Sequence, residues 1–303
     1  MDRAEYKKKN SDMKTRVISA TVMIVGAFAM MAISRLTRIL FLTAFSILST
    51  REMANVLRKY SLDIKEVKEK DEPETPVFNT KWPLLACSVI VMSVLIWFRL
   101  DLSWYIAWFS CSVFLILFAE IVSKDWYIPE RARNAIGNIF CLVYPAGPFF
   151  LIIYYCAKDY WVGPFLLACI ATWTCDSFAL FGGRAFGKRK LASLVSPKKT
   201  WEGTLTGAAS SLLAGLLVWA LLRFIPFLKP HALPLVPCLV TALISSTLGQ
   251  LGDLTASLFK RMADLKDYSN LIPGHGGAMD RVDSLLFSIP STFFILNLFG
   301  VLG

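Results

Sequence analysis

Four aspartates draw attention because each lies inside or beside an apolar segment. Asp176 and Asp253 interrupt long uncharged stretches, and Asp280 and Asp283 stand three residues apart at the start of another. An ionised carboxylate at membrane depth costs about 3 kcal/mol on insertion scales, so such positions indicate function. Converging carboxylates repel one another unless a cation neutralises them, and ligation by oxygen alone suits Mg²⁺. We therefore predict a magnesium site with Asp253 and Asp280 as ligands.

The same acids have simpler interpretations. Asp253 can form an ion pair with Lys260. Asp283 is either a ligand of a second cation or a residue that orients a loop through the helix dipole. For Asp176, ligation and ion pairing are equally supported. Glu120, near the end of its apolar segment, is expected to reach the interface or to pair with Lys124.

Two segments, 182–202 and 260–283, combine glycines with basic residues and carboxylates. Glycine allows close backbone approach and lysine neutralises phosphate charge, so both segments are predicted to handle phosphates. The alternative is that a basic loop only fixes membrane orientation. The chain contains no G-x-x-x-x-G-K-[ST] motif, so a nucleotide would be held differently from its position in a P-loop enzyme.

The elements that position these residues are expected to be membrane helices. Of 303 residues, 55% are hydrophobic and only 18% are charged, whereas about a quarter are charged in soluble domains. This excludes a disordered or fibrous protein. The fold class is all-α, a polytopic integral membrane protein with about nine transmembrane helices. They are placed at 17–34, 36–50, 83–98, 102–123, 134–156, 160–181, 203–222, 234–259 and 284–302.

Charge distribution sets the expected orientation. With a cytoplasmic amino terminus, 26 of the 32 Lys and Arg lie in cytoplasmic segments, as the positive-inside rule requires. Span 36–50 could instead lie at the interface, but the segment 184–199 would then change sides. We expect one membrane domain over 1–303. Its parts are the amino-terminal helices, 1–130 with the polar linker 61–82, and a catalytic half, 131–303.

The segment 257–283 carries a specific pattern. It reads Ser257, then Lys260-Arg261, Lys266-Asp267, Pro273, His275-Gly276-Gly277 and Asp280-Arg281-Val282-Asp283. This pattern resembles that of the phosphatidate cytidylyltransferases, the CDP-diacylglycerol synthases. Ala278 is smaller than the apolar residue usual in that family. Residues 196–203 also resemble the family, whereas the first 130 residues match it only in hydropathy.

The resemblance implies an enzyme of phospholipid synthesis that transfers CMP from CTP to phosphatidate, releasing pyrophosphate and depending on Mg²⁺. A compact chain without a long soluble extension favours a bacterial plasma membrane, and the charge distribution predicts an active site on its cytoplasmic side. The partners are then CTP, phosphatidate and membrane lipid, without nucleic acid, and homo-oligomerisation is left open. A phosphate monoester has a second pKa of about 6, so the lipid phosphate is substantially ionised near neutral pH. It can act as the nucleophile itself, without a protein nucleophile or a strong general base.

The resemblance also assigns roles within the two loops. Contacts with the reacting phosphates are expected from four basic residues, Lys260, Arg261, Lys266 and Arg281. Asp267 would position Lys266 or take part in proton transfer, and His275 would make a structural hydrogen bond or contact phosphate. Substrate binding is expected from Lys198, Lys199 and Thr200. We further expect Lys260 and Arg261 to lie nearest the metal, with Lys198 and Lys199 farther away.

Two other functions fit parts of the pattern. A CTP-dependent lipid kinase also joins a cytidine nucleotide to a membrane lipid, but its reaction is at the γ-phosphorus. A transporter could bind a coupling ion at intramembrane acids. That interpretation predicts sequence repeats and a site at the membrane midplane, and no repeat is evident in this chain.

Overall fold

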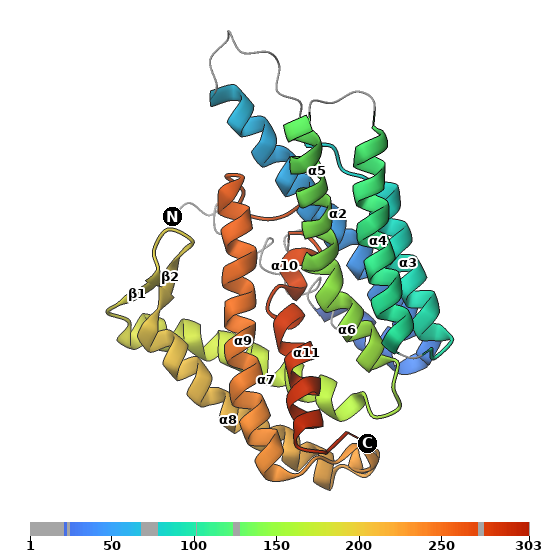
Figure 1. Ribbon diagram of the computed structural model, residues 1–303. Helices are drawn as coiled ribbons and strands as arrows, with labels where there is room; N and C mark the ends of the chain where they lie inside the picture. Colours follow the sequence, from blue (N-terminus) through green and yellow to red (C-terminus); the bar gives the residue numbers. More distant parts are fainter. Residues whose placement is uncertain are drawn as a thin grey trace. The chain divides into compact units, whose positions relative to one another are not determined.

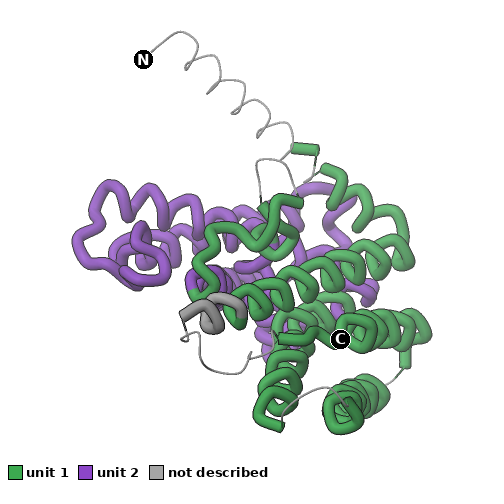
Figure 2. Tube along the Cα trace, turned by 90° about the horizontal axis from the view of Figure 1, so that it is seen from above, with its two compact units in different colours: residues 1–153, 262–281 green, residues 154–261, 282–303 purple. Residues whose placement is uncertain are grey.

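The computed structural model describes residues 21–22, 25–67, 78–100, 102–123, 128–271 and 276–302. His275, Lys124 and much of the first predicted span lie outside these residues. The chain divides into two compact units, which Figure 2 colours separately. The first unit contains residues 1–153 and 262–281, and the second contains residues 154–261 and 282–303.

The first unit is a bundle of helices (Figure 1). Its elements are α2 (Arg35–Val67), α3 (Trp82–Trp97), α4 (Leu102–Val122), α5 (Ile128–Cys141), the π-helical turn η1 (Leu142–Ala146) and most of α6 (Gly147–Cys156). Helix α2 packs against α3, α5 and η1, and α4 packs against α3 and α5. Pro83 lies in the first turn of α3, where a helix needs no backbone N–H donor. The short helix α10 (Met279–Val282) begins in this unit.

Two asparagines on α5 hold the segment that precedes α3. The Oδ1 atom of Asn134 accepts a hydrogen bond from the Asn79 amide at 3.2 Å. Asn138 accepts one from the Lys81 amide at 2.8 Å and donates one to the Asn79 carbonyl at 3.0 Å. Both asparagine side chains are buried, so these bonds fix residues 79–81 against α5.

The buried carboxylate of Glu120 has a different ion-pair partner from the one expected. Its Oε1 lies 3.7 Å from Nζ of Lys81, and Glu120 is 2% exposed. Lys124, the predicted partner, is outside the described residues. The pairing joins α4 to the residue before α3, which sequence spacing along one helix could not reveal.

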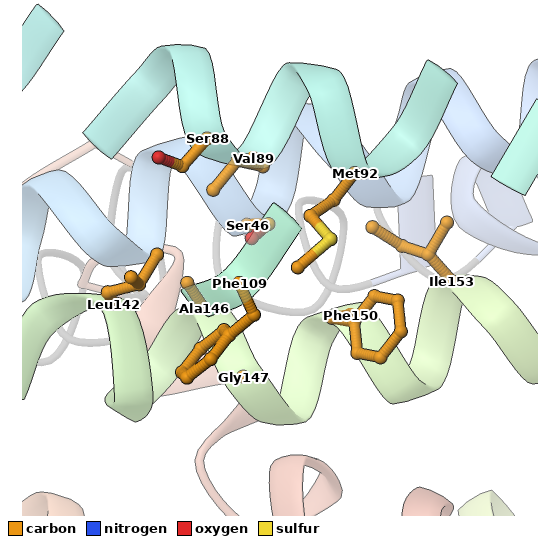
Figure 3. Close-up of a pocket in the computed structure, with 10 residues that line it drawn as sticks. All are labelled: Ser46, Ser88, Val89, Met92, Phe109, Leu142, Ala146, Gly147, Phe150 and Ile153. Atoms are coloured by element: carbon orange, nitrogen blue, oxygen red, sulfur yellow. The ribbon is translucent and has the colours of Figure 1, made fainter. Parts of the chain in front are cut away.

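A small apolar cavity of about 20 Å³ lies among α2, α3, α4 and the η1–α6 segment (Figure 3). Its lining consists of Ser46, Ser88, Val89, Met92, Phe109, Leu142, Ala146, Gly147, Phe150 and Ile153. The two serine hydroxyls are the polar side-chain groups among these residues. The cavity therefore suits hydrocarbon and has no groups that would bind a charged substrate.

The second unit is built on two closely packed helices, α7 (Val162–Phe186) and α8 (Trp201–Phe224). Gly203 and Gly207 lie one turn apart on α8. A Cβ atom at Gly203 would lie 2.5 Å from the Ala179 carbonyl oxygen, and one at Gly207 would lie 2.6 Å from the Cys175 carbonyl oxygen. Small residues four apart let helix backbones approach in this way.

The other elements of this unit follow in the sequence. A hairpin of β1 (Lys190–Ala192) and β2 (Ser196–Thr200) joins α7 to α8, and the turn η2 (Lys229–His231) leads into α9 (Leu235–Met262). Helix α11 (Leu285–Leu298) packs on α7. A buried core that includes Leu167, Val218 and Leu222 holds these helices together.

The described chain is predominantly helical, and five of its helices are long and apolar enough to cross a membrane. They are Ser103–Val122, Ile128–Cys156, Val162–Phe186, Trp201–Phe224 and Leu235–Met262. Helix α3 is also apolar but has 16 residues. The remaining predicted spans, the orientation and the single-domain organisation stay predictions.

Two predicted segments differ from the structure. Helix α2 continues from the predicted span 36–50 through Val67, so the expected linker 61–82 begins as helix. The expected loop 182–202 contains the end of α7, both strands and the first residues of α8. Hydropathy locates apolar segments but does not show where a polar segment continues a helix or forms a hairpin.

Candidate functional site

An ion pair between Lys199 and Asp253 lies at the centre of the polar groups in the second unit. The Nζ atom of Lys199, on β2, lies 2.6 Å from Oδ2 of Asp253, on α9. The same ammonium group donates a hydrogen bond to the Gln250 carbonyl at 3.3 Å. The side chains of Lys199 and Asp253 are 22% and 30% exposed, so the pair is partly screened from water. A short ion pair of this kind is stronger than one on an open surface.

A second carboxylate, Asp176 on α7, belongs to the same cluster. It interacts electrostatically with both Lys199 and Asp253, and its Oδ2 accepts a hydrogen bond from Ser284 Oγ at 3.3 Å. Lys199 therefore offsets part of the repulsion between two carboxylates from different helices. The sequence predicted that Asp176 and Asp253 converge, and the structure brings them together within this unit.

Asp283 approaches the cluster through its backbone. A Cβ atom at Gly252, the residue before Asp253, would lie 2.6 Å from the Asp283 carbonyl oxygen. The Oδ1 atom of Asp283 accepts a hydrogen bond from the Ser284 amide at 2.8 Å. Glycine at 252 thus lets the 283–284 segment pack directly on α9. This arrangement supports the interpretation that Asp283 orients the segment that carries Ser284.

Hydrogen bonds at both ends of the hairpin hold Lys199 in position. Thr200 is the N-cap of α8, and its Oγ1 accepts a hydrogen bond from the Gly203 amide at 3.1 Å. Glu202 accepts hydrogen bonds from the amides of Lys188 and Arg189 at 3.0 and 3.2 Å. Thr200 was predicted to bind substrate, but its hydroxyl caps a helix and the residue is 6% exposed.

The basic residues at the end of α9 differ in their exposure. Lys260 is buried, at 8% exposure, whereas Arg261 is exposed and donates a hydrogen bond from Nε to the Val195 carbonyl at 3.4 Å. Arg261 thus joins α9 to the hairpin. Lys198, next to Lys199, is exposed. The expectation that Lys199 lies farther from Asp253 is wrong, because Lys199 forms the short ion pair with it.

In the first unit, Asp280 closes the loop that follows α9. Its Oδ2 accepts hydrogen bonds from the amides of Tyr268 and Gly277, at 2.8 and 3.0 Å. Gly276 has a φ of +81°, and a Cβ atom there would lie 2.9 Å from the same carboxylate oxygen. A residue with a side chain would be strained at this position. One predicted metal ligand therefore also joins Tyr268 to Gly277.

Three other predicted site residues of the segment 262–281 lie at the surface. Lys266, Asp267 and Arg281 are exposed and belong to the first unit, as Asp280 does. His275 is outside the described residues. Asp253, Lys260 and Arg261 belong to the second unit, so the predicted site residues are divided between the two units.

Glu52, on α2, contacts the backbone before Asp280, and the sequence did not indicate this contact. It is 5% exposed on α2, and its Oε1 accepts hydrogen bonds from Ser269 Oγ at 2.6 Å and the Ala278 amide at 3.0 Å. Its Oε2 accepts one from the Met279 amide at 2.7 Å. A Cβ atom at Gly277 would lie 2.5 Å from Oε1. Glu52 therefore fixes the backbone directly before Asp280.

Two acids of this cluster carry oxygens of the kind that hard divalent cations bind. Asp176 and Asp253 supply carboxylate oxygens, and Oδ1 of Asp253 accepts a hydrogen bond from Ser257 Oγ at 3.4 Å. Within the parts of the chain that the structure describes, no group of three or more His, Cys, Asp or Glu residues is arranged to hold a metal. Lys199 supplies the positive charge beside these two acids.

Comparisons with known proteins place this arrangement in a family. A model of the "Cytidylyltransferase family" matches residues 14–299. The phosphatidate cytidylyltransferase of Haemophilus influenzae is 35% identical over 199 residues, covering 65% of this chain and 67% of that protein. That of Rickettsia bellii is 37% identical over 190 residues, covering 62% and 80%. That of Bacillus subtilis is 42% identical over 133 residues, covering 44% and 47%.

The chain belongs to the cytidylyltransferase family. It is therefore an enzyme of that family, and the resemblance stated for 196–203 and 257–283 is confirmed. The family match begins at residue 14, so it also includes the amino-terminal region, which was expected to resemble the family only in hydropathy. Glu52 lies in that region. The sequence carries one signal for Glu52, because like Asp176 it is a carboxylate in a largely apolar helical stretch. The adjacent Arg51, however, is typical of the polar end of such a stretch.

Proposed function

We propose that the chain transfers CMP from CTP to phosphatidate and yields CDP-diacylglycerol and pyrophosphate. An oxygen of the lipid phosphate attacks the α-phosphorus of CTP. The bond from that phosphorus to the oxygen bridging to the β-phosphate breaks, and pyrophosphate leaves with the electron pair. The observation that carries the proposal is the cluster of Lys199, on β2, with Asp253 and Asp176 from the apolar helices α9 and α7.

The main physical requirement of this reaction is to bring two polyanions together. Preorganised positive groups can lower that repulsion and stabilise the departing pyrophosphate. Lys199 is held in place by Asp253 and the Gln250 carbonyl, and the exposed Lys198 is next to it. Arg261 adds a guanidinium group beside the hairpin. Lys260, Lys266 and Arg281 are proposed to contact phosphates as well.

Magnesium is proposed as the cofactor. In the second unit, Asp176 and Asp253 would hold it, and Asp280 and Asp283 remain ligands predicted from the sequence. When bound, Mg²⁺ would screen the triphosphate and favour departure of pyrophosphate. The residues of the chain would orient the phosphates around this charge. Asp267 is proposed to position Lys266.

Orientation in the membrane completes the proposal. We propose nine spans with a cytoplasmic amino terminus in a bacterial plasma membrane, which places both basic segments on the cytoplasmic side. Soluble CTP would then reach the site from the cytoplasm. Phosphatidate would reach it from the membrane with its headgroup at the interface.

The direct test is to incubate the purified protein with phosphatidate, Mg²⁺ and CTP labelled separately in cytidine and in the γ-phosphate. CMP transfer places the cytidine label in lipid and the γ-label in pyrophosphate. A γ-label in lipid with release of CDP would identify a lipid kinase instead. Absence of both lipid products from an active, folded preparation would contradict the proposal.

A further inference from the structure

The first unit contains a basic pocket whose lining includes none of the residues assigned to the reaction. It has a volume of about 450 Å³ and lies between α2 and the segment that leads into α3. On α2, Arg51, Asn55 and Arg58 lie at intervals of four and three residues, so they form one stripe of the helix. All three side chains are exposed. The lining residues include two arginines and no acid among the described part of the chain.

The wall opposite this stripe is fixed in place. Residues 79–81 are held by the buried Asn134 and Asn138, as described above. The Phe78 amide donates a hydrogen bond to Ser61 Oγ at 2.9 Å, which joins this segment back to α2. The Phe78 ring lies directly over Gly137, where an added Cβ atom would collide with it. The pocket is therefore preorganised and does not have to form when a ligand arrives.

The polar groups of the pocket match the chemistry of a phosphate. Arginine presents planar N–H donors that suit phosphate oxygens, and Asn55 and Thr80 add amide and hydroxyl donors. The Arg51 guanidinium lies 5.9 Å from the centre of the Trp82 ring. This cation–π contact helps to hold Arg51 beside the aromatic side of the pocket. No described carboxylate forms an ion pair with Arg51 or Arg58.

The position of the pocket indicates a lipid ligand. Trp82 begins the apolar helix α3, which is a predicted span, and tryptophan is enriched at the membrane interface. The proposed orientation places 51–82 on the cytoplasmic side, where anionic headgroups attract basic side chains. A pocket of this size can hold a phosphate together with the polar part of a glycerolipid.

We propose that the Arg51–Arg58 pocket, which none of the residues assigned to the reaction lines, binds the headgroup phosphate of an anionic phospholipid. Arg58 and Arg51 hold the phosphate, Asn55 and Thr80 donate hydrogen bonds, and Trp82 contacts the apolar part of the lipid. The site gives the enzyme a bound membrane lipid that is not consumed.

The test uses native mass spectrometry of the full-length protein in detergent, titrated with phosphatidylglycerol. This lipid is a phosphodiester, so its retention does not depend on the proposed reaction. Wild type should retain phosphatidylglycerol more tightly than phosphatidylcholine. Arg58→Gln should weaken the apparent affinity about five- to tenfold, and Arg51→Gln with Arg58→Gln should abolish the selective retention. Arg58→Lys should fall between wild type and Arg58→Gln because it keeps the charge but loses the planar donors.

The matched control is Lys59→Gln, which removes one charge from the adjacent residue of α2 that does not line the pocket. It should change the affinity less than about twofold. Equal retention by wild type and Arg58→Gln would overturn the proposal, and so would equal retention of phosphatidylcholine. A separate titration with inorganic phosphate distinguishes the source of the anion. Arg58-dependent binding of phosphate without Arg58-dependent binding of lipid would assign the pocket to a soluble anion and reject a lipid site.

Discussion

Lys199 forms a 2.6 Å ion pair with Asp253. The two residues lie on different elements, β2 and α9, and the hairpin that carries Lys199 is fastened at Thr200 and Glu202. An ammonium group held in this way is preorganised beside a predicted metal ligand. The ion pair joins the basic segment 182–202 to α9, the helix that carries Lys260 and Arg261 in its last turn.

The first prediction follows from this ion pair. Lys199→Ala removes a fixed charge beside Asp176 and Asp253, so kcat should fall about a hundredfold, as for loss of a major electrostatic stabiliser. Lys198→Ala is the matched control because Lys198 is adjacent and exposed. It should mainly raise KM for one substrate. Steady-state kinetics with CTP and phosphatidate varied separately would measure both effects. A larger loss of kcat in the Lys198 variant would contradict this assignment.

A second prediction concerns the acids. Asp253→Asn and Asp280→Asn should each lower turnover at least about a hundredfold at saturating Mg²⁺, while the protein stays folded in detergent. The asparagine oxygen of the Asp280 variant can still accept a loop hydrogen bond, so loss of charge is the principal change. Thermal unfolding in detergent provides the folding control. Near-normal turnover in both variants would exclude these residues as metal ligands.

The sequence predicted the helical membrane architecture and part of the site because both depend on strong local signals. Long uncharged segments predict helices, and an acid inside such a segment has few structural explanations, as at Asp176 and Asp253. The family motif predicted Asp280 and its loop. In each case the signal lies within one segment of the chain.

Pairings between distant segments could not be predicted in the same way. Lys199 meets Asp253 because a hairpin replaces the expected loop, and Lys81 meets Glu120 because Asn138 holds the residues before α3. Glu52 reaches residues 277–279 across more than 200 positions of sequence. Such contacts depend on the packing of whole helices and leave no periodic pattern.

A third prediction tests orientation. In a cysteine-free background, single cysteines at 70, 128 and 195 should react with a membrane-impermeant reagent only from the cytoplasmic side. Those at 100 and 230 should react only from the outside. The physical basis is the concentration of Lys and Arg in the predicted cytoplasmic segments. Labelling of position 195 from the outside would contradict the nine-span topology and the proposed cytoplasmic site.

A fourth prediction concerns the packing of α7 on α8. Gly207→Ala places a Cβ atom 2.6 Å from the Cys175 carbonyl oxygen and 2.9 Å from the Ala179 Cβ, so the helices must separate. The expected cost is about 1–3 kcal/mol, seen as a lower thermal midpoint in detergent. Gly26→Ala is the control, because no atom lies within 4 Å of the added Cβ and the residue is exposed. Equal midpoints for the two variants would show that the close approach contributes no stability.

The last prediction assigns Glu52 a positioning function in the loop that ends at Asp280. Glu52→Gln replaces one carboxylate oxygen with an N–H₂ donor that must face either the Met279 amide or the Ser269–Ala278 pair. Two N–H donors then face each other beside a side chain that is 5% exposed, which should lower the free energy of unfolding by about 1–3 kcal/mol.

Loss of these contacts should release the backbone before Asp280, so proteolysis within 263–271 should accelerate and kcat should fall more than KM rises. Glu130→Gln, a partly exposed acid at the start of α5, provides the control and should change the unfolding free energy by less than about 1 kcal/mol. If Glu52→Gln lowers the thermal stability but leaves loop proteolysis and kcat unchanged, then Glu52 contributes only to the stability of α2 and does not position the loop.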